Sequence, residues 1–371
     1  MAYPTGELSV DLRAIADNWR YIAGKLHTDT HCGAVVKANA YGLGVDRIAP
    51  KIYEAGCRNF FVANLKEAIQ LQSLLGPDAL IFVLSGCIAG AEETFVERNI
   101  IPVIVSYSML TRWVTALRKL GDNSANAQAV LKVDTGMGRL GLEATDFNRL
   151  LEDDVLFREA KITYLMSHLA CADDTDHNLN ALQIARFNDM YTALKAKGFD
   201  VKTSLANSAG IFLGEHTHGD IVRPGIALYG GNPGLKINPM QPVVGLSLPI
   251  LQIRHLVAGE AIGYGATRRF DENRVIAIAS GGYADGIMRS LGNKGWGFLA
   301  GHKVPIVGRI SMDSTMFDIT DVPSASDIHE GAAIEILGEN VSIDDLARAA
   351  GTISYEILTS FGARYQRCYL D

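Results

Sequence analysis

The sequence has no run of lysine and arginine and no apolar stretch long enough to cross a membrane. Its 371 residues carry a net charge of -7 at pH 7, whereas nucleic acids and anionic membranes need clustered positive charge on the proteins that bind them. The N-terminus lacks the apolar core of a signal peptide, because Glu7 and Asp11 fall where it would lie. We therefore expect a cytoplasmic protein that binds small molecules, and neither nucleic acid nor membrane.

The five cysteines are odd in number, scattered, and without a CxxC pair. This spacing indicates neither a disulfide framework nor a structural zinc site. The segment SHLACADDTDH, residues 167–177, gathers histidine, cysteine and aspartate but lacks a second matched pair of metal ligands. Its acidic part is more typical of the start of the long helix that follows, so we predict reduced thiols and no metal.

What the sequence does contain is a repeated alternation of short apolar runs and amphipathic segments, which is typical of βα units. Eight such runs predict strands at residues 34–37, 60–63, 80–84, 102–105, 129–133, 162–167, 203–206 and 220–223. Eight parallel βα units indicate a TIM (β/α)8 barrel, whose active site lies at the carboxyl ends of the strands.

The texture of the chain changes at NPGLKINPMQPVVG, residues 232–245, which is rich in proline, glycine and asparagine. Short β-branched runs follow, and the chain closes with two helical patterns. We predict an α/β protein in which residues 1–11 form a strand that joins the C-terminal domain. Residues 12–235 form the barrel and residues 236–371 a mainly-β domain.

The stretch AVVKANAYGLG, residues 34–44, places Lys37 at the end of the first predicted strand. A lysine in that position either extends its amine to solvent or loses solvation and has a lowered pKa. A neutral amine can form a Schiff base. The residues leave both interpretations open.

The loop GMGRLG, residues 136–141, matches the dinucleotide pattern GxGxxG. The strand before it carries Lys132 and Asp134, however, and the loop falls in the fifth repeat rather than opening a fold. The next helix also begins late, near Thr145. These features favour a cationic active-site loop that carries Arg139 over a dinucleotide site.

Several other residues lie near the carboxyl ends of predicted strands or in turns where an active site could form. His168 follows the sixth predicted strand, and Ser208 and Gly225 follow the seventh and eighth, where barrels often bind phosphate. Ordinary turn chemistry explains the last two equally well. In the second domain Tyr264 and Tyr283 lie in glycine-rich turns, either as exposed turn residues or as phenols that act as acid or base.

Nine motifs in one order carry a resemblance to a known family: AVVKANAYGLG, LKVDTGMGRLG, SHLACADD, NSAG, VRPGIALYG, GYGATR, GGYADG, GRISMD and SYEILT. Over essentially the whole chain they resemble the pyridoxal-phosphate-dependent alanine racemases. The sequence departs from the family at Leu43, where histidine is common, and at Gly210, where alanine is usual. Neither change removes a reactive group.

The resemblance implies that Lys37 forms a Schiff base with pyridoxal 5'-phosphate. It also implies a set of cofactor-binding residues: Tyr41, Arg139, His168, Asn207, Ser208, Arg223, Gly225, Ile226 and Tyr355. In this set Arg223 would face the pyridine nitrogen and leave it unprotonated, because an arginine does not readily give up a proton. His168 would connect Arg223 to Tyr264.

The resemblance further implies a two-base mechanism that interconverts L- and D-alanine through an external aldimine, with Lys37 on one face and Tyr264 of the partner subunit on the other. The catalytic unit would be a homodimer with shared active sites. Substrate would contact Arg139, Tyr283, Met312 and Asp313. Tyr283 and Tyr355 would narrow the entrance to a methyl-sized side chain, and Lys132 matches a lysine that is carbamylated in some members.

Three alternatives stay open on the sequence. A broader amino-acid racemase or a decarboxylase would share the barrel and the β domain, and a non-catalytic pyridoxal-phosphate carrier would need the barrel alone. The same site would serve either the synthesis of D-alanine as a peptidoglycan precursor or the degradation of alanine.

Overall fold

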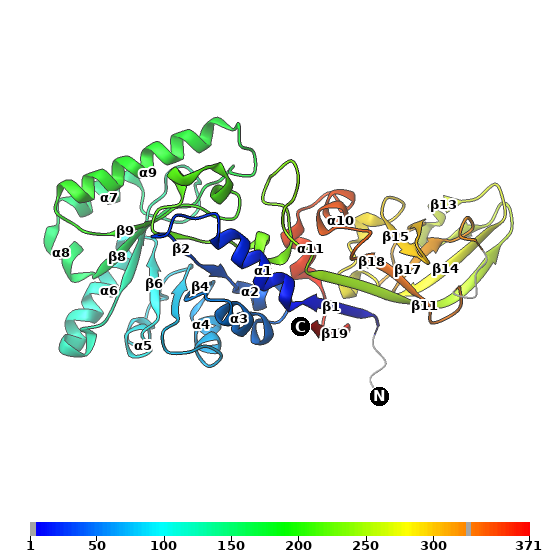
Figure 1. The fold of residues 1–371 in the computed structure, drawn as a ribbon, viewed down its shortest axis with the longest axis horizontal. Helices are drawn as coiled ribbons and strands as arrows, with labels where there is room; N and C mark the ends of the chain where they lie inside the picture. The colour runs from blue at the N-terminus through cyan, green and yellow to red at the C-terminus, as the bar shows by residue number, and fades with distance from the viewer. Residues whose placement is uncertain (1–4, 324–327) are drawn as a thin grey trace.

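The computed structural model describes residues 5–323 and 328–371. Residues 1–4 of the predicted N-terminal strand segment lie outside the described part. The chain forms two bodies side by side, a barrel of strands and helices and a mainly-β domain, with α10 and α11 close to the junction (Figure 1). The predicted fold class, an α/β barrel followed by a mainly-β domain, is confirmed.

The barrel is built from parallel strands in chain order. Seven of them form one sheet, from β3 to β9, and β10 pairs with β2. The strands are β2 (His31–Cys32), β3 (Ala34–Val35), β4 (Asn59–Val62), β5 (Leu80–Val83), β6 (Ile101–Ile104), β7 (Ala129–Lys132), β8 (Ile162–Met166), β9 (Lys202–Ser204) and β10 (Ile221–Val222). Because β2 continues through Gly33 into β3, and Arg223 N donates to Ala206 O beside β9, β10 closes the circle.

Helices surround this sheet and bury apolar faces against it. They are α1 (Leu12–Ala23), α2 (Lys37–Tyr41), α3 (Val45–Glu54), α4 (Leu65–Gln72), α5 (Glu92–Glu97), α6 (Tyr107–Leu120), α7 (Ala144–Leu151), α8 (Asp154–Glu159) and α9 (Asn178–Ala196). The strands read as continuous apolar runs because both faces are covered; all four residues of β4, β6 and β7 are buried. None of the helices in the described residues is long and apolar enough to span a membrane.

The mainly-β domain is organised around one long strand, β11 (Val244–Leu256), which pairs with β1, β14 and β18. Its other elements are β1 (Glu7–Asp11), β12 (Ala261–Ile262), β13 (Arg268–Arg269), β14 (Arg274–Ser280), β15 (Trp296–Leu299), β16 (His302–Pro305), β17 (Ser314–Asp318), β18 (Ala333–Leu337), α10 (Ile343–Ala350), α11 (Ser354–Ser360) and β19 (Gln366–Leu370). Strand β1 therefore lies in this sheet, antiparallel to β11 and parallel to β19, although it precedes the barrel in the chain.

One local expectation about the long helix is wrong. We predicted that the acidic stretch before α9 forms its first turn, but α9 begins at Asn178 and its first turn contains no acid. His177 caps the helix instead, because its Nδ1 accepts a hydrogen bond from Leu179 N at 3.1 Å.

Candidate active site

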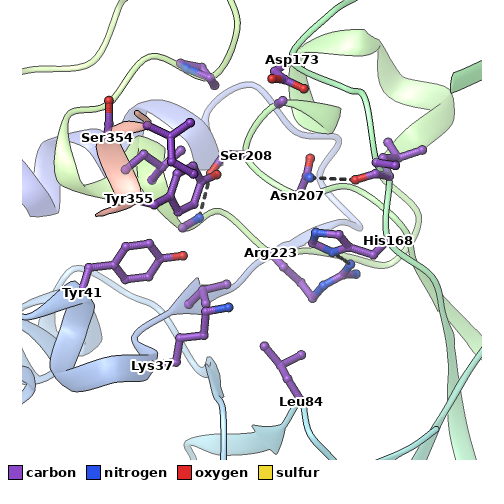
Figure 2. Close-up of a pocket in the computed structure, with 18 of the residues that line it drawn as sticks. Lys37, Tyr41, Leu84, His168, Asp173, Asn207, Ser208, Arg223, Ser354 and Tyr355 are labelled. Carbon is purple, nitrogen blue, oxygen red and sulfur yellow. Dashed lines mark hydrogen bonds between the residues drawn. The ribbon is translucent and has the colours of Figure 1, made fainter. Parts of the chain in front are cut away.

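A cavity of about 870 Å³ opens at the carboxyl ends of the barrel strands. The loops after the strands form most of its wall, and α10 and α11 of the β domain form the rest (Figure 2). The predicted residues that line it are Lys37, Tyr41, Lys132, Arg139, His168, Asn207, Ser208, Arg223, Gly225, Ile226 and Tyr355. The fold therefore gathers into one space a set of residues that are scattered along the chain.

We had predicted that Lys37 ends the first strand, but this prediction is wrong. Strand β3 ends at Val35, and Lys37 begins the short turn α2. The four residues after it, from Ala38 to Tyr41, all have left-handed φ angles, between 52° and 57°. Each costs about 1 kcal/mol for a residue other than glycine, so the surroundings must stabilise this turn.

Two side chains from distant parts of the chain hold the turn. Glu67 of α4 accepts hydrogen bonds from the backbone N–H groups of Ala38 at 3.0 Å and Ala63 at 2.7 Å. On the other side, the hydroxyl of Tyr369 in β19 donates to the carbonyl of Leu43 at 2.9 Å. Neither Glu67 nor Tyr369 was singled out from the sequence, because only the tertiary structure brings them to this turn.

The amine of Lys37 points into the cavity and makes no hydrogen bond or ion pair within the described ranges (Figure 2). Burial lowers its pKa, the charge of Arg139 lowers it further, and Glu67 acts in the opposite direction. Burial, followed by the charge of Arg223, also lowers the pKa of Lys132 to about 8. The site thus disfavours charged amines, which raises the fraction of neutral, nucleophilic amine.

Arg223 is buried at the floor of the cavity beside His168 (Figure 2). Its Nη2 donates to the carbonyl of Ser167 at 2.7 Å and lies 3.4 Å from Nδ1 of His168. Burial lowers the pKa of Arg223 to about 10, so the guanidinium remains charged at neutral pH. Burial, and then the charge of Arg223, lowers the pKa of His168 well below its ordinary value, so this imidazole is neutral.

A second wall of the cavity presents hydroxyl groups and closely approaching backbone. Ser208 Oγ accepts hydrogen bonds from the N–H of Gly225 at 2.8 Å and of Ala227 at 3.3 Å. A Cβ on Gly225 would overlap the hydroxyl of Tyr41, whose ring lies 5.8 Å from that of Tyr355. Hydroxyl groups and small residues around a backbone turn are the composition that suits a phosphate group.

The GxGxxG loop is occupied by a side chain of the protein itself. Asp134 accepts hydrogen bonds from the backbone N–H groups of Gly136, Met137 and Gly138, at 2.8 to 3.2 Å. Burial raises the pKa of Asp134, but these hydrogen bonds outweigh burial and hold it below its usual range. Because this aspartate fills the anion-binding turn, the loop serves to present Arg139 and not to bind a dinucleotide.

The other predicted residues of the second domain do not line this cavity. They are Tyr264, Tyr283, Met312 and Asp313, and Tyr264 is 72% exposed. Two of their turns are joined, because Ala284 N donates to the Met312 carbonyl at 3.1 Å and Gly281 N donates to that of Asp313 at 2.9 Å. The chain therefore displays Tyr283, Met312 and Asp313 together on the β domain, and neither they nor Tyr264 line its own barrel cavity.

The departure at Gly210 has a local explanation. A Cβ there would lie 2.9 Å from Cδ1 of Leu169 and 3.3 Å from Oδ1 of Asn207. Asn207 is held in turn by hydrogen bonds that join it to Gly210 N and the Leu169 carbonyl. Glycine therefore makes room for Leu169 in the wall of the cavity.

The described residues contain no group of histidine, cysteine, aspartate and glutamate that could hold a metal ion. All five cysteines are free. Amines, guanidinium groups, an imidazole and phenols line the cavity.

Fold and cavity together define the class of the protein: a two-domain barrel enzyme with a lysine at the barrel mouth whose amine has no partner among the described residues. Residues 10–233 match the alanine racemase N-terminal domain family and residues 243–369 match the alanine racemase C-terminal domain family. The chain belongs to the alanine racemase family.

Individual relatives are similar to this chain over nearly its full length. The alanine racemase of Rhodospirillum rubrum is 47% identical over 366 residues, which cover 98% of this chain and 96% of that protein. The catabolic alanine racemase of Agrobacterium fabrum is 41% identical over 99% of this chain and 92% of its own length. The crystal structure of alanine racemase from Bartonella henselae with covalently bound pyridoxal phosphate has a TM-score of 0.92, with 41% identity and 99% of each chain covered.

Proposed function

We propose that this protein is an isomerase that interconverts L- and D-alanine with pyridoxal 5'-phosphate. Its place in the alanine racemase family and the likeness to the Bartonella henselae enzyme, a structure with covalently bound pyridoxal phosphate, support the activity and the cofactor. The observation in this chain that carries the proposal is the unpaired amine of Lys37, which faces the buried guanidinium of Arg223 across one cavity.

The residues present fit the cofactor. The amine of Lys37 has the lowered pKa that covalent attachment to an aldehyde needs. Ser208, Tyr41, Tyr355 and the turn at Gly225 and Ile226 are assigned to its phosphate, and Asn207 supports the same wall. When bound, pyridoxal phosphate withdraws electrons from the α-carbon of the amino acid and makes its proton acidic.

Arg223 restrains this withdrawal. We assign its guanidinium to the ring nitrogen of the cofactor, because it is fixed by carbonyl groups and still charged at neutral pH. A donor that keeps its own proton leaves the ring nitrogen unprotonated and the electron withdrawal modest. Modest withdrawal favours return of a proton to the α-carbon over side reactions.

Racemisation needs a group on each face of the α-carbon, one to remove a proton and the other to return one. We assign one face to Lys37. As the resemblance to the alanine racemases implies, we assign the other face to Tyr264 of the partner subunit in a homodimer, with Arg139, Tyr283, Met312 and Asp313 around the substrate.

Chiral analysis of L-alanine incubated with the purified protein and pyridoxal phosphate in deuterated water tests the proposal. We expect D-alanine that carries deuterium at the α-carbon. Lys37→Ala should lose both this product and the absorbance of the attached cofactor, whereas Lys66→Ala, a change of an exposed lysine on α4, should lose neither. A bound cofactor without exchange at alanine would overturn alanine as the substrate, and serine, lysine and arginine would be tested next.

A further inference from the structure

Helix α9 (Asn178–Ala196) has an unusual inner face. Its fully or nearly buried residues include Asn180 and Gln183, and Gln183 is 0% exposed. Together with Arg186 these polar residues recur every three positions, a spacing that places them on one side of a helix. A buried amide is costly unless its polar atoms find partners; Oδ1 of Asn180 has none among the described residues, whereas both ends of the Gln183 amide are hydrogen-bonded.

Gln183 uses both ends of its amide on two different loops. Its Nε2 donates to the carbonyl of His168 at 2.9 Å and to Oγ1 of Thr135 at 3.2 Å. Its Oε1 accepts from the N–H of Ala170 at 2.9 Å. A single side chain thereby joins the loop after β7 to the loop after β8.

The same two loops carry Arg139 and His168 of the cavity lining. Thr135 opens the loop that presents Arg139, and its Oγ1 lies 2.9 Å from Oγ of Ser167. The carbonyl of Ser167 accepts from Arg223 on the cavity side, while the next carbonyl, that of His168, accepts from Gln183 on the helix side. The backbone at His168 is therefore fixed from both sides.

The two neighbours of Gln183 on the helix extend the contact. Asn180 Nδ2 donates to the carbonyls of Cys171 at 3.1 Å and Asp174 at 2.8 Å, on either side of the cavity residue Asp173. Arg186 Nη1 donates to the carbonyl of Thr135 at 3.1 Å. Among the described residues, every side-chain hydrogen bond of this row ends on one of the two active-site loops.

We propose that Gln183 is a positioning residue of the active site, whose buried amide fixes the loops of Arg139 and His168 relative to Arg223. The inference rests on the proposed function, because it names those residues as active-site groups. The spacing of His168 Nδ1 and Arg223, 3.4 Å, is at the limit of a hydrogen bond, so a small shift of the loop breaks their contact. Gln183 itself lies outside the cavity lining and touches no reacting atom.

The test compares Gln183→Leu with Leu194→Ala. Leu194 is a buried residue farther along α9 that does not face either loop, so its replacement should lower stability only. For each holoenzyme we would measure kcat, KM for L-alanine, the cofactor dissociation constant, Tm and hydrogen exchange of the two loops. Gln183→Leu should lower kcat about 10- to 100-fold and accelerate exchange at residues 168–174, with cofactor affinity within about threefold of the original. Leu194→Ala should lower Tm and leave kcat and loop exchange unchanged.

A kcat for Gln183→Leu within twofold of the original, or an equal loss in Leu194→Ala, would overturn the proposal. If Gln183→Leu does not fold, Thr135→Val decides by the same kcat and exchange criteria, since it removes one bond of the network. Failure of the unaltered protein to racemise alanine would count against the proposed function alone. Loop exchange and the absorption band of the bound cofactor would then still decide whether Gln183 positions the site.

Discussion

At the scale of single residues, the cavity concentrates positive charge. Lys37, Lys132, Arg139 and Arg223 all line it, and each amine has a lowered pKa. Asp173 and Asp344 also line the cavity, but positive charge is in excess, and an excess of like charge in a poorly solvated space is unfavourable until a partner arrives. An anionic cofactor and a carboxylate substrate would supply that partner.

The free-energy cost of a poorly solvated positive charge can be measured at Lys132 in the cofactor-free protein. Its pKa is about 8 in the folded chain against 10.5 for an unperturbed lysine, so between these pH values the unfolded state binds more protons. The cost is fully present below pH 8 and is relieved as pH rises from about 8 to 10.5. Relative to Lys132→Met, the free energy of unfolding should therefore rise over this window by about 3 kcal/mol. Denaturant titrations that give a pH-independent difference would contradict the lowered pKa.

Tyr264 allows a test of the second base. Tyr264→Phe keeps the ring and removes the hydroxyl, so it should slow α-proton exchange of L-alanine by about 10² or more while exchange of D-alanine, assigned to Lys37, is much less affected. The measurement is deuterium incorporation into each enantiomer at short times. Tyr283→Phe, in the other glycine-rich turn, is the matched control and should preserve the balance of the two directions. Equal loss in both directions for Tyr264→Phe would exclude a face-specific role.

At the scale of elements, short turns carry more of the site than helices or strands do. The left-handed turn α2 presents Lys37 and Tyr41, and the turn after β10 presents Gly225 against the Tyr41 hydroxyl. The two turns meet without a helix or strand between them. A change in either turn should therefore alter the wall of the cavity that is assigned to the phosphate of the cofactor.

Gly225→Ala tests that contact. A methyl group on Gly225 would overlap the hydroxyl of Tyr41, so this change brings the two turns into collision. We expect cofactor affinity to fall about tenfold or more in an absorbance titration. In a Tyr41→Phe background the same change should cost less, because the overlapping hydroxyl is gone. An undiminished cost there would place the cause elsewhere.

At the scale of the whole molecule, the β domain contributes in two ways. Within one chain, α10, α11 and β19 close the cavity and hold the lysine turn. The groups on its far turns, Tyr264 and Met312, are exposed and do not reach the cavity of their own chain. In the proposed homodimer they would complete the cavity of the partner.

Mixed dimers test this sharing of sites. Lys37→Ala and Tyr264→Phe each disable one contribution, but a dimer with one chain of each kind would contain one intact site and one doubly altered site. Unfolding and refolding of an equal mixture should restore about a quarter of the original activity, since half of the dimers would be mixed and each would have one working site. Each variant refolded alone is the control. A mixture no more active than its components would reject the shared site.

Much of the fold and of the cavity was predictable from residue patterns. The alternation of apolar runs and amphipathic helices predicted the barrel, and Lys37, His168 and Ser208 were singled out because they end or follow predicted strands, whereas Arg223 was named from the resemblance. The end of the first strand and the start of α9 were predicted wrongly, since a left-handed turn and a histidine cap leave little local signal. Gln183 was missed because a glutamine in a long helix usually faces solvent.

The sequence by itself determined the order of the βα units, the residue types at the ends of the strands and the family of the chain. These depend on local periodicity and on motifs that can be compared position by position. Only the tertiary structure decided that Ala38 to Tyr41 turn left-handed, that Asp134 fills its own glycine loop and that Gln183 joins two loops. These outcomes depend on contacts between segments far apart in the chain, whose free energy outweighs the local preference of each segment.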